Sequence, residues 1–348
     1  MREYINNPNA VAGLSRRTML MAATSCAAAL FAPRFVHAAE SGHLTMMMPN
    51  ILSPAFADVL VAQSNGHFKK QGLDVELLGV RSGVLPLQNV ITGKTQLART
   101  GTIVMVKAVE KGAKCKSIAS IAQGSSFFLV SLESDPIRTP KDAVGESIGV
   151  VSLRGPMDLV ADAMLAAEDV ALDSVKRQIV SDNPGSVALM EAKRVKGFFA
   201  NAETIARIRT EGTKIHILDP QQYMPLPSQV YIAANDEIDK NGDTFVAFIK
   251  AVAAAIHDIV ADKSLDATIA GLKRINVGGM ENEDAAKAAI RGVQRSWFAA
   301  GEDNLLRNVP QNWTKGMAVA VKSGMTAPIP MSSLYTNALV DKALGQKS

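Results

Sequence analysis

The sequence has few cysteine and aromatic residues. It contains two cysteines, Cys26 and Cys115, among 348 residues, and aromatic residues make up 5% of the chain. Two cysteines cannot supply a four-thiolate zinc site, and no two histidines outside the N-terminal region have metal-ligand spacing. We therefore expect no metal ion and no cofactor. Few side chains are candidates for stacking on a ligand, namely Phe127, Phe128, Phe199 and Tyr223.

Catalytic motifs are also lacking. The chain has no G-x-S-x-G, H-E-x-x-H, C-x-x-C or G-x-G-x-x-G pattern. Gly93, Lys94 and Thr95 match the end of a phosphate-binding loop, but Gln88 stands where the first glycine is needed. The sequence thus assigns no catalytic residue, and we expect a protein that is not an enzyme.

No apolar run is long enough to span a bilayer, which requires roughly 20 residues. The stretch from Phe245 to Val260 is interrupted by Lys250, His257 and Asp258, which indicates an amphipathic helix. The shorter run from Met19 to Ala32 follows the paired Arg16 and Arg17.

That N-terminal order predicts a bacterial export signal. Paired arginines, a short apolar run and the small residues around His37 are typical of a twin-arginine signal, cleaved after Ala38 or Ala39. A membrane anchor is disfavoured by the length of the run. Lipidation of Cys26 is disfavoured because Ala23 occupies the usual leucine position of a lipobox. We expect a periplasmic protein that engages the twin-arginine translocase during export.

Charge gives little indication of a macromolecular partner once the signal is removed. Residues 1–39 contain four arginines and one glutamate, so the remaining chain has 33 basic and 32 acidic residues of the original 37 and 33. Neither nucleic acid nor an anionic membrane is indicated as partner. Cys115 alone remains, which excludes an intramolecular disulfide.

Short apolar runs alternate with helical patterns from Leu44 to Ala122. The alternation restarts at Ser147 and ends at Leu218. Such repeats predict α/β units built on parallel strands. Two proline-marked connections, near Leu132 and before Gln229, separate the repeats, and only helical patterns follow residue 237.

We therefore predict a two-lobed α/β protein with a hinge. After the signal, residues 40–131 would form the first part of lobe one and residues 132–228 would form lobe two. Residues 229–348 would return a strand to lobe one and add C-terminal helices that pack on it. The run Met46 to Met48 is expected to fill the core of the first strand.

Three stretches resemble the periplasmic solute-binding proteins of ABC importers, in the nitrate/sulfonate/taurine and thiamine-precursor group (NMT1/SsuA-like). They cover residues 65–78, 87–93 and 137–150, and the resemblance extends from about Leu44 to Ile259. It implies a type II periplasmic-binding-protein fold of two doubly wound sheets, acting as a monomer with a membrane permease and its ATPase. Gln96 and Lys196 stand where the family usually has aspartates. The resemblance therefore does not assign the solute of a known relative to this chain.

In open α/β sheets, ligands bind beyond the carboxyl ends of strands. This rule places the ligand-binding residues in loops of both lobes. In lobe one the predicted residues are Asn50, Ser53, Arg81, Ser82, Arg99, Thr100, Gly101, Thr102 and Gln123. In lobe two they are Ser152, Arg154, Gly155, Asn183, Asn201 and Glu203. Backbone N–H groups of Ser53, Thr102 and Gly155 are expected to be free for an anion.

Arginine in three of these loops favours an anionic ligand, because a guanidinium matches a carboxylate, sulfonate or nitrate. Arg99 and Arg154 are expected to approach the ligand from opposite lobes. Asp182 and Glu203 instead favour an amine or a pyrimidine amino group, although Glu203 is also a candidate helix cap.

Two functional hypotheses follow. The first is a non-catalytic protein that closes on a small anion and delivers it to a permease, with a pyrimidine as the alternative solute. The second is an enzyme of the thiamine-pyrimidine or menaquinone-pathway type on the same fold. The absence of catalytic motifs and the export signal favour the first.

Replacing both Arg16 and Arg17 by lysine should block export, because the twin-arginine pathway requires the arginine pair and not only positive charge. Immunoblots of periplasmic and cytoplasmic fractions measure the outcome. A protein with the same substitutions at Arg138 and Arg209 is the control and should be exported normally. Normal periplasmic accumulation of the Arg16→Lys, Arg17→Lys protein would assign export to the general secretion route.

Overall fold

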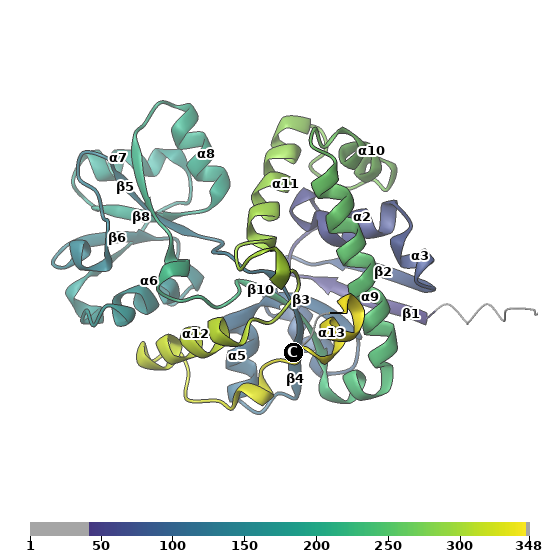
Figure 1. The fold of residues 1–348 in the computed structure, drawn as a ribbon. Coiled ribbons are helices and arrows are strands. Elements are labelled where there is room, and N and C mark those ends of the chain that lie inside the picture. The colour runs from purple at the N-terminus through teal and green to yellow at the C-terminus, as the bar shows by residue number, and fades with distance from the viewer. Residues whose placement is uncertain (1–41, 346–348) are drawn as a thin grey trace, which may run out of the picture. The chain divides into compact units, whose positions relative to one another are not determined.

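The structure is a computed structural model, which describes residues 42–345 (Figure 1). The predicted signal, with Arg16, Arg17 and Cys26, lies outside the described residues. The strands in chain order are β1 Gly42–Met48, β2 Leu73–Gly79, β3 Leu97–Gly101, β4 Cys115–Ala122, β5 Phe128–Leu132, β6 Ser147–Val150, β7 Lys176–Ile179, β8 Gly197–Ala200, β9 Ile215–Leu218 and β10 Gln229–Ala234.

Helices connect these strands and make up most of the chain after β10. The α-helices are α2 Ala57–Ser64, α3 His67–Lys70, α4 Leu85–Ile91, α5 Thr102–Glu110, α6 Pro156–Ala167, α7 Val187–Glu191, α8 Ala202–Thr210, α9 Asn235–Ala261, α10 Asp266–Arg274, α11 Glu283–Trp297, α12 Pro310–Lys322 and α13 Ala338–Leu344. Short 3₁₀ helices are η2 Pro54–Phe56, η3 Pro140–Ala143, η4 Leu172–Ser174, η5 Pro184–Ser186, η6 Pro220–Gln222, η7 Glu302–Asn304 and η8 Met331–Ser333.

The strands form two five-stranded sheets. Sheet one has the order β2-β1-β3-β10-β4, and sheet two has the order β7-β6-β8-β5-β9. This two-lobed α/β architecture confirms the predicted fold class. Three neighbouring strands in each sheet are parallel, β2-β1-β3 in sheet one and β7-β6-β8 in sheet two. The pairing starts with Gly42 opposite Leu73 in sheet one and with Ser147 opposite Lys176 in sheet two.

The strands of the two predicted repeats, β1–β4 and β6–β9, run parallel as expected, and one further strand in each sheet runs antiparallel to its neighbours. β10 runs antiparallel to β3 and β4, and β5 runs antiparallel to β8 and β9. These are the strands that enter a sheet from the other sheet. Because their connections come from outside the sheet, they need no right-handed helical crossover and can run against their neighbours.

The two connections between the sheets are short. The chain leaves β4 at Ala122 and enters β5 at Phe128, and it returns between Leu218 and Gln229. The first connection therefore lies before Leu132, the residue at which the sequence pattern suggested the boundary. The turn-rich stretch after Leu132 instead follows a strand of sheet two.

Both faces of sheet one are covered by helices. Met46 and Met48 point into the core formed with α2, α3, α9, α10 and α11, whereas Met47 joins the core with α4, α5 and α12. The three methionines are buried, with 0, 6 and 0% of their surface exposed, which confirms their predicted role as core residues. Their alternation follows from the two-residue period of a strand.

α9 crosses the first of these faces. By length and hydropathy α9 could span a membrane, yet its side chains Phe245, Phe248, Ile249 and Ile256 are fully buried against the sheet and α2. α9 is the central core helix of this lobe (Figure 1). The amphipathic helix predicted from Phe245 to Val260 is confirmed as part of it.

Sheet two is covered by shorter helices. α6 packs on the face that includes Ile148, Val150 and Phe199, and α7 and α8 pack on the face that includes Val130 and Phe198. Phe199 has no exposed surface. It is therefore a core residue and is removed from the candidates for ligand stacking.

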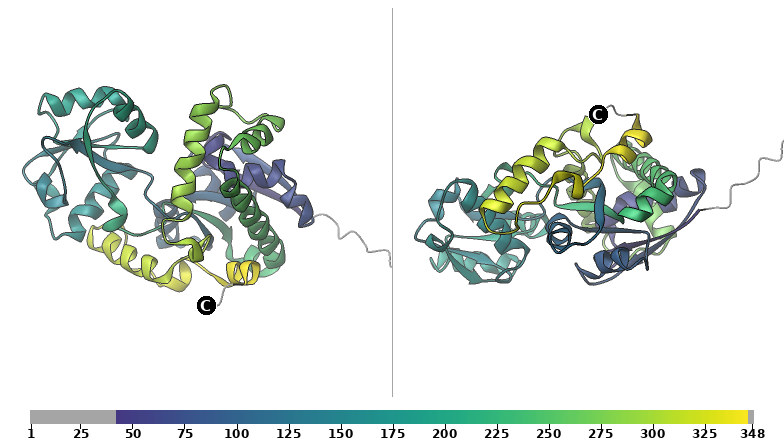
Figure 2. Two further views of the ribbon diagram at one scale, coloured as in Figure 1. Left: turned by 45° about the horizontal axis from the view of Figure 1, so that its top comes forward. Right: turned by 90° about the horizontal axis from the view of Figure 1, so that it is seen from below.

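The C-terminal helices pack mainly on sheet one, as predicted, but α12 also contacts α6 of lobe two. Trp313 and Met317 of α12 share a buried cluster with Ala163 of α6. Lys322 at the end of α12 forms an ion pair with Asp169 just after α6, with 2.6 Å between Nζ and Oδ1. Both views in Figure 2 show α12 beside α6.

Replacing Gly149 by alanine should lower the free energy of unfolding by about 1–3 kcal/mol, because it overpacks the core of sheet two. An added Cβ would lie 2.6 Å from Phe198 Cβ and 2.6 Å from Val180 Cγ2. Urea unfolding measures the change. Gly292→Ala in α11, where the nearest atom is at 3.9 Å, is the control and should leave stability equal or higher. Equal stability of Gly149→Ala would contradict this packing.

Candidate functional site

Each sheet has a topological switch point, where successive connections leave toward opposite sides. β1 lies between β2 and β3 in sheet one, and β6 lies between β7 and β8 in sheet two. Ligands of open α/β sheets bind at the carboxyl ends of such strands. The segments at these ends are residues 49–53 and 101–102 in sheet one, and residues 151–155 and 201–203 in sheet two.

The segment that follows β2 is hydrogen-bonded to the carboxyl ends of β1 and β3. Val80 N–H donates to Met48 O at 3.2 Å, and Thr100 Oγ1 donates to Gly83 O at 3.4 Å. This brings Arg81, Ser82 and Thr100 to one end of sheet one, near Asn50 and Ser53. Arg81 and Asn50 are exposed, and Ser53 and Ser82 are half-buried, so they remain candidates for contact with a solute.

Arg99 is not in a loop, in contrast to the sequence-based expectation. It lies within β3 and is only 3% exposed. Its Nη1 is 3.1 Å from Asp58 Oδ1, and its Nε donates to Gln229 Oε1 at 2.5 Å. The guanidinium also lies over the Phe56 ring, at 5.0 Å from the centroid. The charge of Arg99 is therefore already compensated inside lobe one.

Asp58 accepts a further hydrogen bond from the Tyr231 hydroxyl. Both residues are fully buried. Burial, and next the Asp58 carboxylate, raise the pKa of Tyr231 well above its usual value, so the hydroxyl stays protonated and donates. A buried carboxylate is thus paired with an arginine and a tyrosine, which satisfies the requirement that buried charges be compensated.

Other predicted polar residues of lobe one are also engaged. Thr102 N–H, expected to be free, donates to Ser228 O at 3.2 Å. Gln123 is 3% exposed, and its Nε2 donates to Asn304 O. Gly101 precedes α5 as its N-cap. Thr102 connects the end of β3 to the returning chain, and Gln123 connects the end of β4 to η7, so their observed role is to hold the end of sheet one together.

In sheet two, hydrogen bonds to Asp158 hold the loop after β6 in place. Asp158 Oδ2 accepts from Arg154 N–H at 2.7 Å, and Asp158 Oδ1 accepts from Arg177 Nε at 2.9 Å. Arg154 has a φ of 56°, which is unusual for a residue with a side chain. Its side chain is exposed, so the loop presents Arg154 in a defined place with its charge available.

Gly155 caps α6 but does not offer a free N–H group, because Gly155 N–H donates to Ser152 O at 3.3 Å. A Cβ at position 155 would lie 2.1 Å from Ser152 Oγ. Only glycine fits there while Ser152 keeps its position. Of the three N–H groups predicted to be free, two therefore have protein acceptors.

The N-terminus of α8 is capped by Asn201 and not by Glu203. Asn201 Oδ1 accepts from Thr204 N–H at 2.8 Å, and Asn201 N–H donates to the Asp182 carboxylate at 3.3 Å. Asp182 thus acts within lobe two as an acceptor for this loop. Glu203 is exposed in the first turn of α8.

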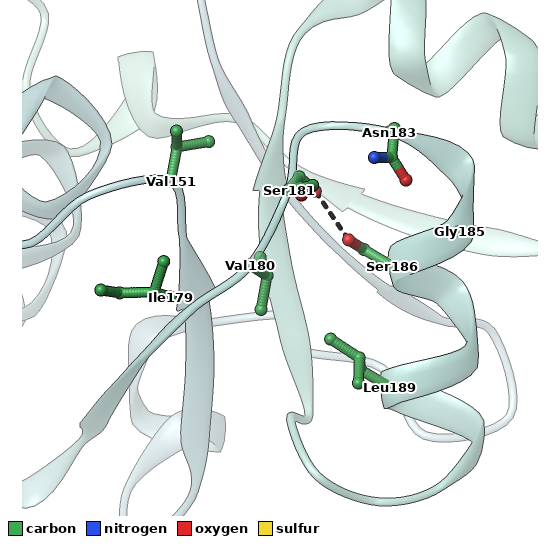
Figure 3. Close-up of a pocket in the computed structure, with 8 residues that line it drawn as sticks. All are labelled: Val151, Ile179, Val180, Ser181, Asn183, Gly185, Ser186 and Leu189. Atoms are coloured by element: carbon green, nitrogen blue, oxygen red, sulfur yellow. Dashed lines mark hydrogen bonds between the residues drawn. The ribbon is translucent and has the colours of Figure 1, made fainter.

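An open pocket of about 480 Å³ lies at the carboxyl ends of β6 and β7 (Figure 3). Its walls are Val151, Ile179, Val180 and Leu189, with Ser181, Asn183, Gly185 and Ser186 on the polar side. Ser186 Oγ donates to Ser181 O at 2.6 Å, which closes the turn that begins η5. Asn183 is the one predicted site residue that lines this pocket.

The sequence carries no signal for the apolar wall, because an apolar residue at a strand end is equally compatible with burial. Phe127, Phe128 and Tyr223 are half-buried and remain candidates for stacking. Burial raises the pKa of Tyr223, so its hydroxyl is a donor at neutral pH. Among the described residues, no group of three His, Cys, Asp or Glu side chains is placed to hold a metal ion.

The sequence matches the profile of the NMT1/THI5 like family over residues 53–264. This match covers more than half of the chain and includes every strand of the two sheets except β1. The chain belongs to the NMT1/THI5 like family. The resemblance stated from the sequence is thereby confirmed.

Two curated relatives and one solved structure are similar to this chain. A putative thiamine biosynthesis protein of Haemophilus influenzae is 24% identical over 60% of this chain and 67% of its own length. The formylaminopyrimidine-binding protein of Halalkalibacterium halodurans is 25% identical over 55% of this chain, and the alignment spans only 58% of its length. A putative periplasmic sulfonate-binding protein SsuA of Methylobacillus flagellatus KT has a TM-score of 0.66 at 18% identity, covering 88% of this chain and 94% of that one.

Replacing Arg99 by alanine should lower the free energy of unfolding by about 3–5 kcal/mol, because it leaves the Asp58 carboxylate buried without its cation. Chemical denaturation measures this change. Arg81→Ala, which removes an exposed arginine from the same end of the sheet, is the control and should change stability by less than about 0.5 kcal/mol. If Arg99→Ala unfolds like the parent protein, the ion pair does not stabilise lobe one.

Proposed function

We propose that this protein is the extracytoplasmic solute-binding component of an ABC importer. It binds a small anion between its lobes and delivers it to a membrane permease that works with an ATPase. The protein is exported to the periplasm by the twin-arginine translocase, acts as a monomer and performs no chemistry on its solute.

One structural observation carries this proposal. Two doubly wound sheets are joined by two connections, and at the carboxyl ends of both sheets lie exposed side chains that the fold does not use. In sheet one these include Asn50 and Arg81, and in sheet two Arg154 and Glu203. Family membership and the fold shared with periplasmic binding proteins support the same function.

The anion would be held by Arg81 and Arg154. Because Arg99 is paired with Asp58, it positions the end of sheet one and does not supply the ligand charge. Arg154 is the stronger candidate, since its loop is anchored through Asp158 and Arg177. An anchored backbone reduces the conformational freedom that this loop loses when its arginine binds a carboxylate or sulfonate.

A second candidate solute is a pyrimidine. The curated relative named as a formylaminopyrimidine-binding protein favours it, and so does the exposed Glu203 carboxylate, which could accept from an exocyclic amino group. The half-buried Phe127 and Tyr223 would supply stacking surfaces. An enzyme of the thiamine-pyrimidine or menaquinone-pathway type is disfavoured because no catalytic motif occurs in the sequence.

A thermal-shift series tests the solute class. The purified protein is mixed separately with nitrate, taurine, ethanesulfonate, benzoate or an aminopyrimidine. A solute present at 100 times its Kd should stabilise the protein by about 2.7 kcal/mol, and mass spectrometry should recover it unchanged. Stabilisation only by the aminopyrimidine would select the second candidate. Conversion of the solute would contradict the binding-protein function.

Arg154→Ala should weaken binding of the anion by one to two orders of magnitude, because a charge-assisted hydrogen bond contributes about 1.5–3 kcal/mol. Calorimetric titration measures the Kd. Arg138→Ala, at an exposed position away from the strand ends, is the control and should bind as the parent does. Unchanged affinity of Arg154→Ala would remove Arg154 from the site.

A further inference from the structure

α12 is part of the core of lobe one. Its side chains Trp313 and Met317 are 0 and 2% exposed, and they lie in one buried cluster with Val230 of β10. The backbone of α12 is also close to the chain that returns from lobe two, because a Cβ on Gly316 would lie 2.4 Å from Leu226 Cγ. α12 is therefore fixed to lobe one and moves with it.

α6 belongs to the core of lobe two and has a second apolar face. Ala161 and Met164 of α6 pack inside lobe two. Leu159 and Ala163 are four residues apart, so they lie on one side of the helix, and they pack in the cluster that contains Trp313 of α12. A helix that is apolar on several sides is one that is covered on several sides. α12 thus covers α6 across the boundary between the lobes (Figure 2).

An ion pair joins the C-terminal ends of the same two helices. Lys322 Nζ lies 2.6 Å from Asp169 Oδ1, and the hydrogen bond and charge of Lys322 lower the pKa of the Asp169 carboxyl. The carboxylate is therefore ionised at neutral pH and the pair is formed. Both side chains are largely exposed, at 46 and 84%, so water replaces the contact readily and the pair separates at low cost.

The contact between α12 and α6 has consequences for movement of the lobes. Lobes joined by short connections move relative to one another unless their interface is large and hydrophobic. This interface is apolar, but it is built mainly from one helix of each lobe. It is therefore sufficient to favour one arrangement of the lobes and too small to prevent others. Because each helix is fixed in a different core, a hinge or shear movement must displace α6 along α12 and separate Lys322 from Asp169.

We propose that α12 is a strap that holds the two lobes in the arrangement of this structure. It acts as a third, non-covalent link beside the two chain connections, with Leu159 and Ala163 as its apolar contact on α6 and the Lys322–Asp169 pair as a contact that opens when the lobes move. The inference goes beyond the proposed function, because it concerns the free protein. Any molecule that binds both lobes would bind with an affinity that depends on this equilibrium.

Pulsed electron paramagnetic resonance tests the strap without any solute. Nitroxides on cysteines that replace the exposed Lys69 of α3 and Arg209 of α8 report the distance between the lobes, and Cys115, which is 1% exposed, stays unlabelled. The combined variant Leu159→Ala, Lys322→Glu should raise the ratio of molecules with a different interlobe distance to those with the parent distance about 10- to 50-fold. Lys322→Glu alone should raise it about two- to fivefold.

The control variant removes matched interactions that lie within single lobes. Lys342 and Asp243 form an ion pair of the same length, 2.6 Å, between two helices of lobe one, and Leu172 is half-buried against the core of lobe two. The combined variant Leu172→Ala, Lys342→Glu should keep the parent distance distribution. Adding Asp169→Lys to Lys322→Glu exchanges the two charges and should restore the parent distribution.

Two outcomes would overturn the strap. One is an unchanged distance distribution in Leu159→Ala, Lys322→Glu, and the other is an equal change in the control variant. If the charge exchange does not reverse the effect of Lys322→Glu, the ion pair has no part in the link. None of these measurements contains a solute, so the strap and the proposed function can fail independently. Circular dichroism of each labelled variant verifies that the fold is kept.

Discussion

A buried ion pair with its hydrogen-bond partners links α2 to strands β3 and β10 of sheet one, at the end where a ligand would bind. Asp58 lies on α2, Arg99 on β3, and Tyr231 and Gln229 on β10. Removing two charges from water is costly, and mutual pairing with extra hydrogen bonds is what makes it tolerable. The pair therefore tolerates little displacement of α2, β3 or β10 relative to one another. Gln229 is the first residue of β10, so the chain that returns from sheet two is fixed where it arrives.

This rigidity is matched by a comparable arrangement in sheet two. Asp158 on α6 holds both the Arg154 backbone and the Arg177 side chain, and Asp182 with Asn201 holds the start of α8. In both lobes, the carboxylates of Asp58, Asp158 and Asp182 fix loops at the strand ends. The exposed charges at these ends are carried by Arg81, Arg154 and Glu203.

The fold was largely predictable because its determinants are local. The alternation of strands and helices, the methionine run of β1 and the amphipathic part of α9 follow from periodicity within single segments. The direction of β5 and β10 was not predictable, because it depends on which sheet each strand joins. The site was less predictable for the same reason: Asp58, the partner of Arg99, lies 41 residues away, and Gln229 lies 130 residues away. Exposure of Val151 or Ile179 could not be inferred either, since an apolar residue at a strand end is equally compatible with burial.

The state of the Cys115 thiol bears on whether folding depends on the redox conditions of the compartment. It is 1% exposed at the start of β4, and burial raises the pKa of its thiol to about 11. The thiolate, which is the reactive form, is therefore almost absent at neutral pH. No oxidation step is needed to complete the fold, and the thiol is protected from oxidants afterwards. The tertiary structure of the described residues can thus be acquired equally well in a reducing and in an oxidising compartment.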